Sequence, residues 1–148
     1  MIKAGAINFL QELIAAAFIL LFAYTGFSKL IDHEVFLNAL QHSPVTSPLS
    51  GALVYLVPID ELAVAGLLLI PAFRRVGFLL ATLAMAIFTT YIAWLLLTAE
   101  ELPCSCGGVI SALSWKQHLV FNIFFLALGA QGYILSRPRQ TAGVAEHP

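Results

Sequence analysis

Charged residues are scarce in this chain. Only 10% of its 148 residues are Asp, Glu, Lys or Arg, whereas 60% are hydrophobic. Soluble domains usually carry about 25% charged residues, so a water-soluble fold could not cover this much apolar surface. The charges sum to −1 and include no basic run, which argues against nucleic acid as a partner. The composition therefore predicts an integral membrane protein.

Cysteine is almost absent as well. The chain has two, Cys104 and Cys106, and both lie in the polar stretch ELPCSCGGVISALSW at 101–115. Neither has any other thiol in the chain to pair with. A disulfide closing so short a loop would stabilise the fold only weakly, so a purely structural bridge is disfavoured.

Long apolar runs dominate the rest of the sequence. At a rise of about 1.5 Å per residue, about 20 residues cross the hydrocarbon core of a bilayer. Four segments reach this length: 7–28, 49–71, 76–98 and 117–136. The first has no clear cleavage site after it, which favours a retained helix over a signal peptide. We expect one all-α domain over 1–148, an integral membrane four-helix bundle, with a flexible tail at 137–148.

Lysine and arginine are distributed unevenly about these spans. With four spans, both termini lie on one side of the membrane, with five basic residues there and two on the other side. The larger group is Lys3, Arg74, Arg75, Arg137 and Arg139, and the smaller is Lys29 and Lys116. By the positive-inside rule, both termini are expected to be cytoplasmic. The cysteines would then face the periplasm from a bacterial inner membrane, a compartment in which disulfides persist.

A short amphipathic segment separates the first two spans. HEVFLNALQH at 33–42 has apolar residues at positions 35, 36, 37 and 40. This pattern predicts a short interfacial helix on the same side as the cysteines. Such a helix could cover the cysteine segment or dock a partner.

The spacing of the cysteines leaves three interpretations open. A disulfide between Cys104 and Cys106 needs a tight, strained turn, which Gly107 and Gly108 would allow, and strain makes a disulfide easier to reduce. The pair could therefore cycle between dithiol and disulfide. Alternatively, the two thiolates could bind a soft metal such as Cu(I), Zn or Hg(II). In the third interpretation they are incidental small residues.

The start of the fourth span carries further candidates. Ser114 is a suitable helix N-cap, and His118 follows one turn later. A cysteine near this helix start, Lys116 or a protonated His118 would hold more thiolate. Trp115 fits an interfacial anchor. Three of the four histidines fall on the expected cysteine side, which would suit a metal site but also an ordinary interfacial helix.

Acidic residues occur inside the expected spans. Glu12, Asp60 and Glu61 are costly at depth, so they are expected to face the bundle interior. Asp60 and Glu61 point about 100° apart, so only one can be central in a given interface. Pro58 removes a backbone hydrogen bond beside them. A bend there suggests a cavity that could hold a ligand or a proton.

Asn122 lies one turn beyond His118 on the same helix face. A line of polar groups could therefore lead from the cysteine segment into the bundle towards Glu61. The alternative is that Glu61 only pairs with a neighbouring helix, through Asn122 or Tyr24.

Three stretches in order resemble the DoxX-like membrane proteins, most closely the MauE branch. They are GFSKL closing the first span, VPIDELAVAGLLLIPAFRR in the second, and PCSCGG with LSWKQHLVFNIFFL leading into the fourth. The resemblance covers about 15–130. Two positions depart from it, since Gly107 stands where an aromatic residue is common and Phe121 where an arginine is common. Lys116 or His118 could supply the missing cation.

The resemblance implies a membrane thiol–disulfide redox protein that exchanges electrons with a thioredoxin-like or disulfide-rich periplasmic partner, and relatives are linked to quinones. Cys104, Cys106, His118 and Glu61 would then carry the chemistry, and Asn122, Trp115 and Asp60 would line a quinone site. One cysteine pair on one side cannot pass electrons across the membrane by thiol exchange alone. Binding or transport of a soft metal, and a non-catalytic adaptor, remain alternatives.

Overall fold

Four long helices dominate the computed structural model, which describes residues 4–98 and 114–136. They are α1 (Ala4–Ile31), α3 (Ser50–Leu69), α4 (Arg74–Thr98) and α5 (Trp115–Leu135). All four are long and apolar enough to cross a membrane, and each matches one expected span. No strand occurs in 4–98 or 114–136. The predicted all-α, four-helix membrane class is therefore confirmed, and the protein is a multi-pass membrane protein.

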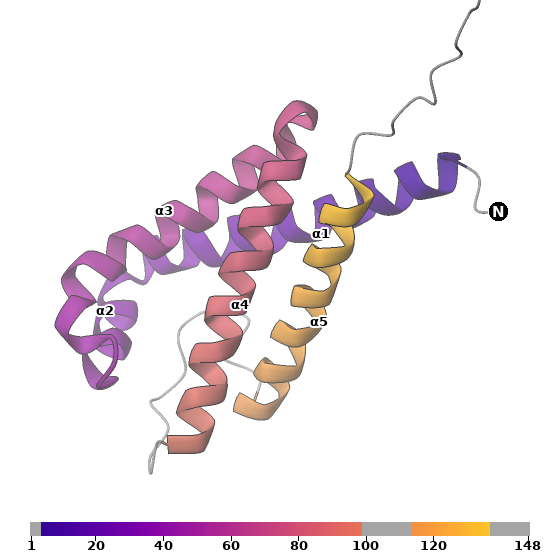
Figure 1. The fold of residues 1–148 in the computed structure, drawn as a ribbon. Coiled ribbons are helices and arrows are strands. Elements are labelled where there is room, and N and C mark those ends of the chain that lie inside the picture. The colour runs from indigo at the N-terminus through magenta and orange to yellow at the C-terminus, as the bar shows by residue number, and fades with distance from the viewer. Residues whose placement is uncertain (1–3, 99–113, 137–148) are drawn as a thin grey trace, which may run out of the picture.

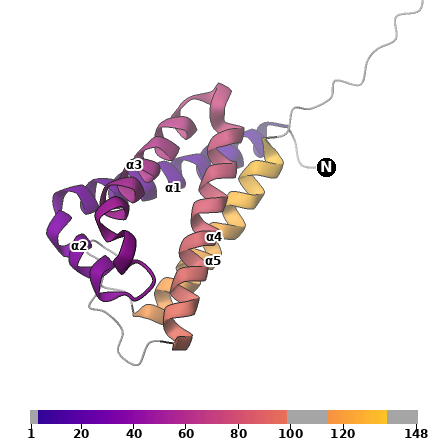
Figure 2. The ribbon, with the colours of Figure 1, turned by 60° about the vertical axis from the view of Figure 1, so that its left-hand side comes forward.

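The helices pack as two neighbouring pairs. α1 lies along α3, and α4 lies along α5. α3 and α4 join the pairs through the short turn η2 (Pro71–Phe73), and α5 also contacts α1. Figure 2 shows α4 and α5 running together, with α1 crossing behind them and α3 meeting α4 at one end. The first turn of α5 and the last turn of α1 lie apart in both views.

Aromatic rings and glycines hold the centre of the bundle. Phe18 of α1 is fully buried, and its ring centroid lies 6.4 Å from that of Phe78 and 5.2 Å from that of Phe125. A Cβ added at Gly132 would lie 2.5 Å from Phe78 Cε1. Because lipid gives no hydrophobic drive between helices, such close packing is the main source of helix association.

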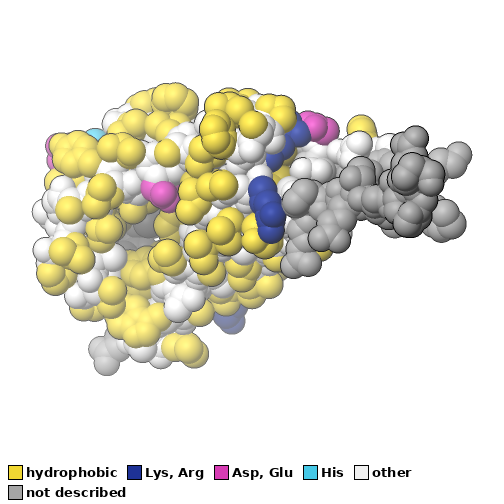
Figure 3. Space-filling view, turned by 45° about the horizontal axis from the view of Figure 1, so that its top comes forward, with side chains coloured by type: hydrophobic (Ala, Val, Ile, Leu, Met, Phe, Trp, Pro, Cys, Tyr) yellow, Lys and Arg dark blue, Asp and Glu magenta, His cyan; other side chains and the backbone are white. Residues whose placement is uncertain are grey.

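The outer surface is apolar. Figure 3 shows hydrophobic side chains over much of the face in view, with few charged groups among them. Large side chains such as Leu20 on α1 and Leu97 on α4 are 72% and 85% exposed. A surface of this kind suits contact with lipid tails rather than water.

The predicted short helix is α2 (His33–His42), with the expected bounds. Phe36 and Leu40 of α2 pack against Val54 of α3. The 3-10 turn η1 (Ser47–Leu49) then leads into α3. α2 therefore covers the first turns of α3, while its position relative to the membrane interface stays a prediction.

Most helix ends lie one to three residues from the expected ones. α1 continues to Ile31, beyond the expected end at 28, and α3 stops at Leu69 because Pro71 starts η2. α3 is continuous through Pro58. Beyond η2, Arg74 forms an ion pair with Glu12, one of the acids expected inside a span.

Three expectations about the chain as a whole stay predictions. They are the single domain over 1–148, the cytoplasmic position of both termini, and the flexible tail at 137–148. The tail lies outside the described residues.

Candidate functional site

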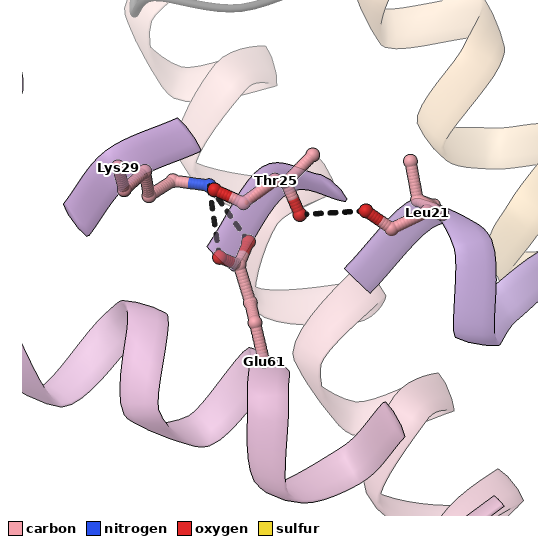
Figure 4. A network of polar contacts seen from close by, with 4 residues as sticks. All are labelled: Leu21, Thr25, Lys29 and Glu61. Carbon is pink, nitrogen blue, oxygen red and sulfur yellow. Dashed lines mark hydrogen bonds and ion pairs between the residues drawn. The ribbon is translucent and has the colours of Figure 1, made fainter. Parts of the chain in front are cut away.

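A buried ion pair joins α1 to α3. Lys29 Nζ donates hydrogen bonds to both carboxylate oxygens of Glu61, at 2.7 and 3.0 Å (Figure 4). The Glu61 side chain is only 3% exposed and that of Lys29 is 18% exposed. Burying one charge alone in a membrane would cost several kcal/mol, and the attraction between the two groups offsets the desolvation of each.

Thr25 completes this group, one helical turn before Lys29. Its hydroxyl donates to the Leu21 carbonyl at 2.9 Å, and its carbonyl accepts from Lys29 Nζ at 3.5 Å. The Thr25 side chain also interacts with the Glu61 carboxylate. The polar groups of one turn of α1 therefore surround the acid.

A close approach of the two helices places the pair. Gly26 packs on α3, where a Cβ would lie 2.9 Å from Leu62 Cγ and 3.2 Å from the Pro58 carbonyl oxygen. No larger residue fits there without a shift. GFSKL and VPIDEL therefore meet in one contact, in which a glycine lets the helices approach and a Lys–Glu pair joins them beside it.

The start of α5 is capped as expected. The Gln117 backbone N–H donates to Ser114 Oγ at 3.3 Å, and the Ser114 N–H donates to Gln117 Oε1 at 2.9 Å. This capping box fixes the first turn of α5. Trp115 and His118 lie on that turn with ring centroids 6.3 Å apart.

His118 belongs to the same polar group as Lys29. It is half-buried, and Lys29 lies within electrostatic range of its ring. Lys29 therefore contacts the Glu61 carboxylate directly and acts on the His118 imidazole only through its charge, so that side chains of three helices are electrostatically linked. We call Thr25, Lys29, Glu61 and His118 the polar cluster.

Asn122 is buried deeper on α5. It is 3% exposed, and its Nδ2 has no hydrogen-bond partner among the described residues. Asn122 therefore does not donate to Glu61, and that expected pairing is wrong, because Glu61 pairs with Lys29. A buried amide without an acceptor is a donor available to a ligand. It suits a carbonyl oxygen, so Asn122 fits the quinone that the resemblance suggests.

The two neighbouring acids of α3 separate, as their angular offset predicts. Glu61 is 2% exposed and faces the interior, as expected. Asp60 is exposed, and it has no hydrogen-bond or ion-pair partner within 4–98 and 114–136. The expectation that every intramembrane acid faces inward is therefore wrong for Asp60, and also for Glu12, whose side chain is 60% exposed. The predicted role of Asp60 in a cofactor site stays a prediction.

Cys104 and Cys106 lie outside the described residues. Their segment, 99–113, connects the end of α4 to the capped start of α5. In the described part of the chain, no group of three or more His, Cys, Asp or Glu residues could hold a metal ion.

Lys29 is the site residue that sequence reasoning missed. It was counted as a loop charge because the first span was expected to end at 28. The signal that could have found it is the spacing TGFSK, in which Thr25 and Lys29 lie one turn apart on a helix face with Gly26 beside them.

The fold and the polar cluster define a four-helix membrane protein in which a buried Lys–Glu pair joins two of the helices. The chain belongs to the family of the methylamine utilisation protein MauE, whose model matches residues 7–135. Membership indicates a membrane protein linked to methylamine utilisation. Comparisons with curated proteins and with solved structures gave no significant match.

Proposed function

We propose that this protein is a membrane thiol–disulfide redox protein of the bacterial inner membrane, with Cys104 and Cys106 on the periplasmic side. Its partner would be a thioredoxin-like or disulfide-containing periplasmic protein. The observation that carries the proposal is the position of the polar cluster. Its imidazole His118 lies on the capped first turn of α5, directly after the segment that holds both cysteines, and Lys29 of α1 acts electrostatically on that ring.

This position matters because the thiolate is the reactive form of cysteine. Positive charge and a helix N-terminus both stabilise a thiolate. The first turn of α5 supplies unpaired backbone N–H groups, and Lys116 and Lys29 supply charge nearby. Because Glu61 partly neutralises Lys29, the net field at the cysteines would depend on the state of this ion pair.

The exchange itself conserves electrons and protons. A partner thiolate attacks the Cys104–Cys106 disulfide and forms a mixed disulfide, releasing one thiolate of the pair. The second partner thiolate then breaks the mixed disulfide, which leaves an oxidised partner and a reduced pair. Two electrons enter the pair, and two protons are taken up as its thiolates are protonated. The reverse sequence would deliver a disulfide to the partner.

The electrons on the reduced cysteine pair need an acceptor, and a membrane-soluble quinone could be that acceptor. When bound, a quinone accepts two electrons and two protons. In this chain Asn122 would hold a carbonyl oxygen through Nδ2, and His118 would lie one turn closer to the cysteines. Glu61, with Lys29, would keep a titratable group beside the site.

A redox titration followed by mass-shift alkylation tests the proposal. Cys104 and Cys106 should form a reversible intramolecular disulfide with a potential near the roughly −120 to −230 mV of exchange-active pairs. A potential below about −300 mV would mark a structural bridge and refute the redox function. Tightly held Cu or Zn without a disulfide at any potential would establish the soft-metal alternative.

A trapping experiment tests whether the cysteine pair exchanges disulfides with a protein partner. Cys104→Ser and Cys106→Ser each leave one thiol, and one of the two variants should accumulate a mixed disulfide with the natural partner. The matched control is the double serine variant, which can form none. Absence of an adduct with both single variants, in membranes that contain a reversible disulfide in the unaltered protein, would favour direct reduction by a small molecule over a protein partner.

A further inference from the structure

Asp60 lies halfway along a membrane-spanning helix and faces outward. At about 1.5 Å per residue it lies about 15 Å from Ser50 and about 13.5 Å from Leu69, the two ends of α3. Lipid headgroups at either surface are therefore out of reach. The side chain is exposed and has no hydrogen-bond or ion-pair partner in the described ranges.

Its surroundings on the helix are apolar. Leu56 and Ile59 on the same side of α3 are 59% and 57% exposed, and Ala63 is exposed one turn further along. A Cβ added at Gly66, beyond Ala63, would contact nothing within 4 Å. Leu56, Ile59, Asp60 and Ala63 form what we call the Asp60 face. It opens away from α1 and α4, which pack on the buried side of α3.

An acidic side chain of this kind is not left in hydrocarbon. Ionisable residues inside a membrane almost always face other protein groups or a water-filled cavity and find a polar or charged partner there, and a basic side chain is the partner that suits an ionised carboxylate. Small residues beside it, such as Ala63 and Gly66, allow another helix to approach closely. The Asp60 face therefore has both the shape and the charge of a helix-docking surface.

Among the residues that the structure describes, a second copy of the chain offers no free cation for Asp60 at mid-membrane. In the described residues Lys29 already pairs with Glu61, Arg74 pairs with Glu12, and Arg75 lies over the Tyr133 ring near the η2 turn. Lys116 lies on the first turn of α5, far from mid-membrane. A two-fold contact through this face would set Asp60 against its own copy, which two carboxylates tolerate only when they share a proton.

From these observations we infer that the Asp60 face binds a transmembrane helix of a different protein, one that presents a Lys or Arg side chain at mid-membrane. The contact is separate from the thiol chemistry, because Asp60 points away from the polar cluster. It would hold a second membrane protein beside this one while the cysteines act elsewhere.

Site-specific photo-crosslinking in native membranes tests this inference with the full-length protein. A photoreactive phenylalanine analogue is placed at Leu56 or at Ala63, one turn on either side of Asp60. The control position is Ile87 on α4, which is 66% exposed. The Asp60 face should give an adduct with another protein, and Ile87 should not. The crosslinked peptide should lie in a membrane span that contains Lys or Arg.

Charge dependence then decides whether Asp60 is the cause. Asp60→Leu should reduce the adduct to background, and Asp60→Glu should retain it. Exchanging the charges, with Asp60→Lys here and Asp in place of the partner's basic residue, should restore it. Since Asp60 is exposed, Asp60→Leu should keep the thermal unfolding temperature in detergent, which separates loss of docking from loss of folding. Serine at Cys104 and Cys106 should leave the adduct unchanged.

Four results would overturn the inference. They are an adduct at twice the mass of this chain, an adduct to a span without a basic residue, an adduct that survives Asp60→Leu, and no protein adduct from either position. The first would establish a contact between two copies. The last would mean that the Asp60 face lies against lipid.

Discussion

Removing the lysine of the buried pair should cost much more stability than removing the acid. Lys29→Met keeps an unbranched stem beside Phe36, whose ring centroid is 5.7 Å from Lys29 Nζ, but it leaves the Glu61 carboxylate without its cation. Glu61→Gln keeps the shape and leaves Lys29 charged. The side chains differ in their access to solvent, at 3% for Glu61 and 18% for Lys29. The unpaired acid is therefore the more costly of the two remnants.

The magnitude follows from the geometry. At 2.7 Å and an effective dielectric constant of about 20, the attraction is about 6 kcal/mol. Desolvation of both groups offsets most of this gain in the intact protein. Removing one partner forfeits the attraction but not the desolvation of the other, which typically costs about 3–5 kcal/mol. We expect about 3–4 kcal/mol for Lys29→Met and about 1–2 kcal/mol for Glu61→Gln.

A double-mutant cycle separates this effect from lost packing. Lys29→Met combined with Glu61→Gln leaves no unpaired charge, so it should be less destabilised than Lys29→Met alone. Glu12→Gln is the matched control, because it breaks an ion pair whose acid is 60% exposed, and it should cost less than about 1 kcal/mol. Reversible unfolding in lipid–detergent micelles, titrated with a denaturing detergent, measures all four variants.

Two results would refute this reasoning. If Lys29→Met were no worse than Glu12→Gln, the pair would be as weakly coupled as a surface ion pair. If the double variant were as unstable as the sum of the single variants, the charges would not interact, and the loss would come from side-chain packing instead.

Two further predictions concern packing and sidedness. Gly132→Ala should destabilise the protein by about 1–3 kcal/mol, because the added Cβ would overlap the Phe78 ring. Gly66→Ala should be neutral or slightly stabilising, since its Cβ would meet nothing within 4 Å. The same unfolding assay compares the two variants, and equal effects would contradict the close packing of α4 and α5. A membrane-impermeant thiol reagent should label Cys104 or Cys106 in intact, reduced cells, and labelling that needs a permeabilised inner membrane would reverse the proposed orientation.

The fold could be predicted because each helix is specified by the residues of its own segment. Four apolar runs of spanning length, an amphipathic pattern at 33–42 and the cap at Ser114 each report locally on a helix. Membrane helices satisfy their own backbone hydrogen bonds, so such local signals suffice to define them. Helix ends were less certain, since α1 continues past the expected end at 28 to Ile31, and α3 stops at Leu69 before Pro71.

The partner of Glu61 could not be predicted in the same way. It depends on the register of α1 against α3, and that register follows from the contact of Gly26 with Leu62 and the Pro58 carbonyl. Hydropathy contains no information about it. The expected partner Asn122 has suitable chemistry but is on α5, whereas the helix that approaches closest to Glu61 is α1. The thiol chemistry remains a prediction, because both cysteines lie outside the described residues.

The neighbouring acids of α3 explain how one short sequence can serve two surfaces. Consecutive helix residues differ by about 100° in direction, so the carboxylates of Asp60 and Glu61 point to different faces of α3. Glu61 obtains its cation from Lys29, and Asp60 has none among residues 4–98 and 114–136. Each charge needs a counter-charge in hydrocarbon. The Glu61 side is therefore complete in this chain and joins α1, α3 and the start of α5, whereas the Asp60 side needs a helix from another protein.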